Sequence, residues 1–170
     1  MDYKLEKLAE FQLIGMEQEF AMETSHQEIP QFWDAFTKTH CAPLWAGKAP
    51  ETALEKAVYG CNIGEFGVCI DDGSVPGRFR YLIAGRYDGR EVPEELTVVS
   101  LPAMEWAKFR CSGPMPEALQ SVSTKIFQEW LPGNPEFEIA RGVNIEWYSM
   151  KKDTSAPDYE SGIWIPVKRK

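Results

Sequence analysis

The chain alternates between short segments with the two-residue period of a β-strand and two segments with the period of a helix. Partial alternation of apolar and polar residues over residues 5–22 predicts a long first strand, bent at Gly15. Apolar runs bounded by glycine and proline turns predict the other strands, at 66–71, 79–84, 96–111 (interrupted at Pro102), 142–148 and 162–167. Strands mixed with helices in this way indicate the α+β class.

Each of the two helical segments carries apolar residues at spacings of three and four. Ser25 and Glu28 have the spacing of a capping box, so the first helix is expected to begin there and to end before Pro43. Its apolar face consists of Ile29, Phe32, Trp33 and Phe36. Pro116 opens the second helix. The apolar face of that helix consists of Leu119, Val122, Ile126 and Trp130.

The order strand, helix, strand, strand therefore occurs twice. Residues 42–55 hold prolines and a glycine and indicate a loop leading to a short helical or irregular piece. A polar link at 88–95 separates the halves, which gives one domain over 1–170 with repeats at about 1–88 and 96–170. The strand Phe66-Gly-Val-Cys-Ile is the first-half counterpart of the strand at 142–148, so Cys69 takes roughly the place of Glu146.

Composition and charge narrow the classes of function. Of the 170 residues, 44% are hydrophobic, which is enough for a sizeable core, and the net charge of −8 argues against a nucleic-acid-binding surface. No apolar run reaches the roughly 18 residues needed to cross a bilayer, and the N-terminus lacks the pattern of a signal peptide. The four cysteines form no Cys-x-x-Cys pair, so we expect reduced thiols, no metal site and a cytoplasmic location. The glycines form no phosphate-binding loop, and no Ser or Cys lies in a nucleophile motif, so we expect no cofactor and no catalytic residues.

Glu146 is the candidate functional residue that the strand pattern places most clearly. Alternation puts Asn144, Glu146 and Tyr148 on one side of the strand at 142–148. A glutamate on a strand usually belongs to a solvated face. If this face is buried, the charge of Glu146 is costly unless a cation compensates it. The residues alone leave both interpretations open.

Several short motifs follow one another in a specific order and spacing: Phe66-Gly-Val, Trp106-Ala-Lys-Phe, Cys111-x-Gly113, Trp130-Leu-Pro-Gly133, Ile145-Glu-Trp-Tyr148 and Ile163-Trp-Ile-Pro-Val167. In this order they closely resemble the GyrI-like effector-binding domain, over nearly the whole chain. That family is the small-molecule-sensing module of many AraC-type and MerR-type regulators, and it also occurs as a stand-alone protein. The match starts within the first few residues, so we expect no helix-turn-helix and no DNA-binding region in this chain.

The resemblance implies a fold and a site. The fold would be two βαββ repeats with pseudo-two-fold symmetry, forming an antiparallel sheet with helices flanking a central ligand groove. The carboxylate of Glu146 would point into that groove and pair with lipophilic cations, as it does in multidrug-sensing members. A cation over an aromatic ring gains roughly 0.5–2 kcal/mol, so aromatic residues are the expected walls. The predicted ligand-binding residues are Glu146, Tyr148, Trp164, Trp33, Phe66 and Trp106.

We therefore expect a drug-sensing or sequestering domain related to transcription regulators. Its partner would be a small lipophilic cation, without direct contact with nucleic acid or membrane, and either a homodimer or a separate regulator protein is compatible with the sequence. Two alternatives stay open. Glu146 would serve as general base in a small-molecule hydrolase, or the chain would bind a protein as an inhibitor of the gyrase-inhibitor type. The sequence indicates neither the natural ligand nor the oligomeric state.

Overall fold

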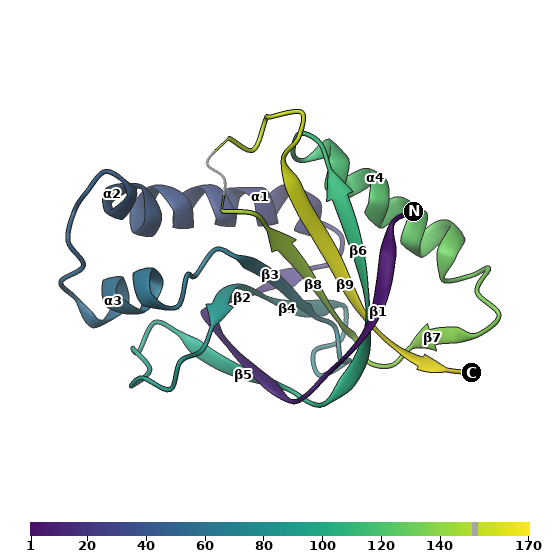
Figure 1. Cartoon of the computed structure of the whole chain (residues 1–170). Coiled ribbons are helices and arrows are strands. Elements are labelled where there is room, and N and C mark those ends of the chain that lie inside the picture. The colour runs from purple at the N-terminus through teal and green to yellow at the C-terminus, as the bar shows by residue number, and fades with distance from the viewer. Residues whose placement is uncertain (151–152) are drawn as a thin grey trace. The chain divides into compact units, whose positions relative to one another are not determined.

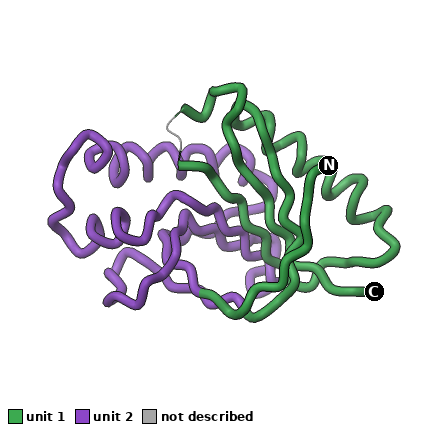
Figure 2. The backbone as a smooth tube through the Cα atoms, viewed as in Figure 1, with its two compact units in different colours: residues 1–11, 102–170 green, residues 12–101 purple. Residues whose placement is uncertain are grey.

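The computed structural model describes residues 1–150 and 153–170 and divides into two compact units (Figure 1, Figure 2). Unit 1 comprises Met1–Phe11 and Pro102–Lys170, and unit 2 comprises Gln12–Leu101. The units part at 11–12 and 101–102, whereas the sequence analysis places a link at 88–95. In the described part of the chain, no helix is both long and apolar enough to span a membrane.

Unit 2 is built on a four-stranded antiparallel segment of sheet in the order β3-β4-β2-β5. Its strands are β2 (Phe11–Ala21), β3 (Phe66–Ile70), β4 (Arg78–Arg86) and β5 (Thr97–Leu101). Its helices are α1 (Ser25–Phe36), the π-helical turn η1 (Thr37–Cys41), α2 (Ala42–Trp45) and α3 (Ala53–Gly60).

Unit 1 contains strands in the order β1-β6-β9-β8, with β7 pairing to β9. The strands are β1 (Tyr3–Leu8), β6 (Met104–Ser112), β7 (Phe137–Ile139), β8 (Val143–Tyr148) and β9 (Glu160–Arg169). The helix α4 (Glu117–Lys125) continues into the π-helical turn η2 (Ile126–Trp130) and packs on β6 and β9.

Both units contain the same βαββ arrangement. In unit 2, β2, α1, β3 and β4 follow one another along the chain, and the strands pair in the order β2-β4-β3. In unit 1, β6, α4, β8 and β9 follow one another, and the strands pair in the order β6-β9-β8. The α+β class and the twofold βαββ order predicted from the sequence are therefore confirmed.

The predicted long first strand is wrong as a single element. Residues 5–22 instead supply two strands, because β1 pairs with β6 in unit 1 while β2 pairs with β4 in unit 2. Gly15 lies inside β2, where an added Cβ would stand 2.3 Å from the backbone oxygen of Ile83. This glycine permits a close approach between β2 and β4.

Helix capping also differs from the sequence-based expectation. At the start of α1, Thr24 is the N-cap and makes no side-chain cap bond, and the hydroxyl of Ser25 donates to the backbone oxygen of Met22 at 3.3 Å. A complete capping box opens α3 instead. The Glu55 backbone N–H donates to the Thr52 hydroxyl at 3.0 Å, and the Thr52 backbone N–H donates to the Glu55 carboxylate at 3.2 Å.

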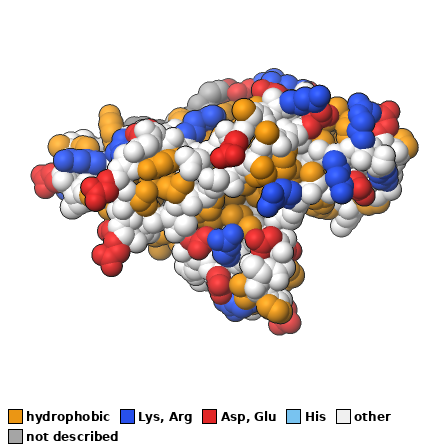
Figure 3. Space-filling view, turned by 90° about the horizontal axis from the view of Figure 1, so that it is seen from below, with side chains coloured by type: hydrophobic (Ala, Val, Ile, Leu, Met, Phe, Trp, Pro, Cys, Tyr) orange, Lys and Arg blue, Asp and Glu red, His pale blue; other side chains and the backbone are white. Residues whose placement is uncertain are grey.

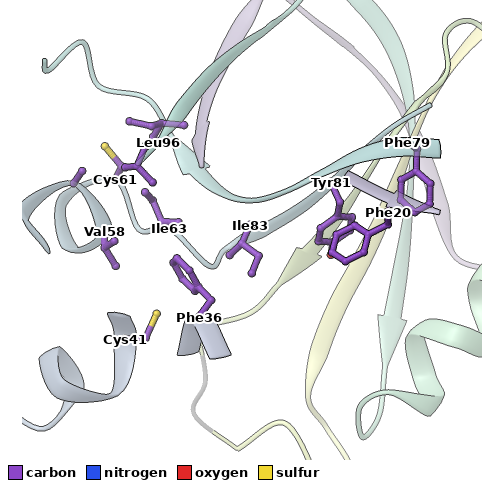
Figure 4. Close-up of a cluster of buried hydrophobic side chains, with 12 residues drawn as sticks. Phe20, Phe36, Cys41, Val58, Cys61, Ile63, Phe79, Tyr81, Ile83 and Leu96 are labelled. Atoms are coloured by element: carbon purple, nitrogen blue, oxygen red, sulfur yellow. The ribbon is translucent and has the colours of Figure 1, made fainter. Parts of the chain in front are cut away.

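Each unit has its own apolar core beneath its long helix. In unit 2, Phe36 of α1 lies beside Ile83 of β4, and Phe20 lies with Tyr81 (Figure 4). In unit 1, Ile126 packs with Phe109 and Ile163 of the sheet. Burying such a side chain contributes roughly 1.5–3 kcal/mol. On the face shown in Figure 3, acidic and basic side chains alternate with exposed hydrophobic ones.

Candidate functional site

The strand β8 carries the predicted carboxylate, and its pairing with β9 fixes which way that carboxylate points. Glu146 lies opposite Ile163, and Tyr148 lies opposite Ser161. Directly opposed residues of an antiparallel pair project to the same face of the sheet. Because Ile163 belongs to the core beneath α4, Glu146 and Tyr148 project to the α4 side of the unit 1 sheet.

Glu146 and Tyr148 interact directly. The Tyr148 hydroxyl donates a hydrogen bond to Glu146 Oε2 at 3.0 Å, and both side chains are half-buried. The ring of Tyr148 also packs against the buried cluster beneath α4. This face therefore holds a carboxylate that a tyrosine hydroxyl orients at the border between core and solvent.

The Glu146 carboxylate affects the Cys111 thiol, which lies on the same α4 side of the sheet. Cys111 of β6 lies opposite Ser161 of β9, which in turn lies opposite Tyr148. Burial is the main cause that raises the pKa of the Cys111 thiol to about 11, and the Glu146 carboxylate adds to the rise while the Ser161 hydroxyl opposes it. Ser161 is only 1% exposed, and its Oγ makes no hydrogen bond of ordinary geometry with the described residues.

Trp164 lies on the opposite face of the unit 1 sheet from Glu146. It is opposed by Ile145 on β8 and by Lys108 on β6. The ammonium of Lys108 stands 3.8 Å from the centre of the Trp164 ring, and it also pairs with Glu6 at 3.0 Å. Lys108 lowers the pKa of Glu6 by this contact. Trp164 therefore already stacks on a cation supplied by the chain.

Trp106 shares the Trp164 side of the sheet and is fully enclosed. It lies opposite Pro166 of β9, has no exposed surface, and packs against Phe11 at a ring separation of 5.9 Å. A ligand would reach this ring only if its neighbours moved. Of the predicted residues in unit 1, the structure therefore brings Tyr148 to Glu146 and places Trp164 and Trp106 elsewhere.

The two predicted residues of unit 2 also lie on different faces of their sheet. Trp33 of α1 donates from Nε1 to the hydroxyl of Tyr81 at 2.8 Å, on the side of the sheet that α1 covers. Phe66 projects to the other side of the sheet. On β3 the residue opposite Tyr81 is Cys69, and Phe66 lies an odd number of positions away from it. Phe66 is 1% exposed, and the guanidinium of Arg86 lies 5.2 Å from its ring centre.

Sequence reasoning passes over Tyr81 as a site candidate. The alternation in Phe79-Arg-Tyr81 could have placed it on the helix-covered face, where its hydroxyl accepts a hydrogen bond from Trp33. Cys69 lies opposite Tyr81 and packs against the core beneath α1. In the same way, Glu146 lies opposite Ile163 on the side of the sheet that α4 covers. The two equivalent strands thus carry a thiol in unit 2 and a carboxylate in unit 1 on the helix-covered face.

The rest of the described chain offers little for metal chemistry. Among residues 1–150 and 153–170, no three His, Cys, Asp or Glu side chains come together as metal ligands. Cys41, Cys61, Cys69 and Cys111 are not joined in disulfides. Burial raises the pKa of Cys41 as well as that of Cys111 to about 11, so these two thiols are protonated at neutral pH.

Solved structures share this fold. SAV2435 bound to tetraphenylphosphonium aligns with a TM-score of 0.76 at 21% identity, covering 99% of this chain and 94% of that chain. An integron cassette protein from the mobile metagenome of Vibrio cholerae aligns with a TM-score of 0.67 at 13% identity, covering 98% and 95%. The C-terminal domain of EcmrR aligns with a TM-score of 0.55 at 14% identity, covering 99% and 98%. At these identities the likeness shows the fold.

No curated protein matches the chain in sequence. The sequence does match the family Cass2, described as integron-associated effector binding protein, over residues 4–167. That match spans both βαββ units and agrees with the GyrI-like effector-binding fold expected from the motifs. The chain belongs to the Cass2 family of integron-associated effector-binding proteins.

Proposed function

We propose that the protein binds a small hydrophobic cation at the α4 side of the unit 1 sheet. Glu146 supplies the counter-charge, and the ring of Tyr148 supplies one wall. The observation that carries this proposal is the hydrogen bond from the Tyr148 hydroxyl to Glu146 Oε2, which orients a half-buried carboxylate beside an aromatic ring. The role that follows is sensing or sequestration of such compounds.

The energetics favour a cation over a neutral ligand of the same size. Two unit charges 4 Å apart attract by about 4 kcal/mol in surroundings like those near a protein surface, before the cost of desolvation. A cation over the Tyr148 ring gains roughly 0.5–2 kcal/mol more. A neutral ligand would remove water from the carboxylate without supplying either the charge–charge attraction or the cation–π contact.

The solved relative SAV2435 supports the same chemistry, because its structure carries tetraphenylphosphonium, a hydrophobic cation.

A thermal-shift comparison of two ions with matched shape tests this proposal. A ligand that binds only the folded state raises the melting temperature. Tetraphenylphosphonium should raise it, while the isosteric anion tetraphenylborate should not. Glu146→Gln should strongly reduce the shift. Glu138→Gln removes an equal charge from an exposed position of β7 and should retain it. Equal shifts with both ions, or an unchanged shift in Glu146→Gln, would overturn the proposal.

A further inference from the structure

The strand β1 forms an open edge of the unit 1 sheet. Within the described part of the chain, β1 pairs with β6 and with no second strand. Two apolar side chains on this strand are markedly exposed, Tyr3 at 41% and Leu5 at 40%. An edge strand with unpaired backbone groups is a template for pairing with another strand.

The hydrogen-bond pattern shows which backbone groups face outward. The N–H of Arg110 donates to the oxygen of Asp2 at 2.9 Å, and the strand register places these two residues opposite each other. In an antiparallel pair, bonded and non-bonded positions alternate. The even positions of β1 therefore bond to β6, and Tyr3, Leu5 and Lys7 present their N–H and C=O groups to the open edge.

We propose that β1 pairs antiparallel with the β1 strand of a second copy of this chain, about a two-fold axis at Leu5. Leu5 then exchanges both backbone hydrogen bonds with the partner's Leu5, and Tyr3 exchanges both with the partner's Lys7. Every outward group of Tyr3, Leu5 and Lys7 is satisfied in this register. The two sheets continue across the axis, and the contact is isologous.

The charges of β1 select this register over its neighbours. Lys4 lies opposite the partner's Glu6, and Glu6 lies opposite the partner's Lys4, at positions where opposed side chains come closest. A slip of two residues in one direction sets Lys4 against the partner's Lys4. A slip in the other direction sets Glu6 against the partner's Glu6. Lys4 lies 3.6 Å from Glu6 of its own strand, and because its side chain is 73% exposed it also reaches toward the second copy.

Side chains on the α4 side of β1 also stabilise the dimer. Leu5 packs on the partner's Leu5, which removes two exposed apolar side chains from water. Lys7 comes opposite the ring of the partner's Tyr3, which allows a cation–π contact. The ring of Tyr3 is held in place by Phe109 and Trp130, with ring separations of 5.1 and 5.2 Å.

Sedimentation equilibrium of the full chain tests the assembly. We expect a dimer of the 19.3 kDa chain that dissociates on dilution. Leu5→Pro removes an N–H that faces the open edge and leaves the bonds from β1 to β6 in place, so it should give a monomer that keeps the secondary structure of the wild type by circular dichroism. A wild-type monomer at every concentration, or a Leu5→Pro variant that stays dimeric, would overturn the proposal.

Cysteine trapping tests the register. Opposed residues of a bonded pair have Cα atoms about 5.5 Å apart, which suits a disulfide. Under mild oxidation Leu5→Cys should form a covalent dimer. Lys7→Cys is the matched control on the same exposed strand, because two Lys7 positions lie four residues apart along the paired strands. Covalent dimer from Lys7→Cys and none from Leu5→Cys would show a different register and contradict the two-fold axis at Leu5.

Discussion

The hydroxyl and the ring of Tyr148 contribute differently to the proposed site. The hydroxyl orients the Glu146 carboxylate through the 3.0 Å hydrogen bond, while the ring offers an apolar surface to any hydrophobic ligand. Tyr148→Phe should therefore weaken binding of tetraphenylphosphonium by a few-fold and leave a neutral aromatic unaffected. Tyr148→Ala should weaken both. Isothermal titration of each variant measures these losses, and equal losses for the cation in Phe and Ala variants would show that the ring makes no contact.

At the same scale, the sequence indicates the Glu146–Tyr148 pair but not the residues around it. Strand alternation needs only local sequence, so it placed these two side chains on one face correctly. The face of Trp164 depends on the register between β8 and β9, which is a long-range property. The pairing of Trp33 with Tyr81 likewise joins a helix to a strand far away in the sequence. The expectation that Trp164, Trp33, Phe66 and Trp106 bind ligand stays a prediction.

At the scale of elements, the helix starts show why local motifs are ambiguous. Ser25 and Glu28 have the spacing of a capping box, yet the hydroxyl of Ser25 bonds backward to Met22. Thr52 and Glu55 have the same spacing and do form the box. Whether such a motif forms a capping box depends on the backbone conformation just before the helix. Thr52 has the extended conformation that an N-cap needs.

Removing the hydroxyl of Thr52 and that of Ser25 should lower the free energy of unfolding of the protein by different amounts. Thr52→Ala deletes a formed cap and should lower the free energy of unfolding by about 1 kcal/mol. Ser25→Ala deletes a hydroxyl that does not cap its helix and should cost clearly less. Urea denaturation of both variants gives the comparison. A larger loss in Ser25→Ala would contradict the assignment of the caps.

The capping residue Glu55 should also make stability depend on acid. Its hydrogen bond from Lys48, followed by that from the Thr52 backbone, lowers the pKa of Glu55 from 4.5 to about 2. A carboxylate with a lowered pKa adds stability above its unfolded pKa, and that stability is lost as the pH falls through the folded value. The stability gap between wild type and Glu55→Gln should therefore be constant above about pH 5 and close between pH 4.5 and pH 2.

Denaturant titrations across this pH range measure the gap. Glu51→Gln, which removes an exposed charge beside the same cap, serves as the control. A gap for Glu55→Gln that does not change with pH would show that the lowered pKa has no consequence for folding.

At the scale of the whole molecule, two βαββ units of the same topology differ in charge at one equivalent face. The helix-covered face of β8 carries Glu146, while that of β3 carries Cys69. The sequence revealed the repeated order, because hydrophobic periodicity survives when identity between repeats is lost. It did not reveal the break between β1 and β2, because both strands share one continuous alternating pattern and differ only in their partners.

The charge preference of the wild-type protein and of Glu146→Gln tests the central claim most directly. Calorimetry would give affinities for tetraphenylphosphonium and for the neutral triphenylphosphine oxide. We predict that Glu146→Gln weakens binding of the cation at least about tenfold, equivalent to about 1.4 kcal/mol, and changes binding of the oxide much less. Equal losses for the two ligands would contradict the role of Glu146 as counter-charge.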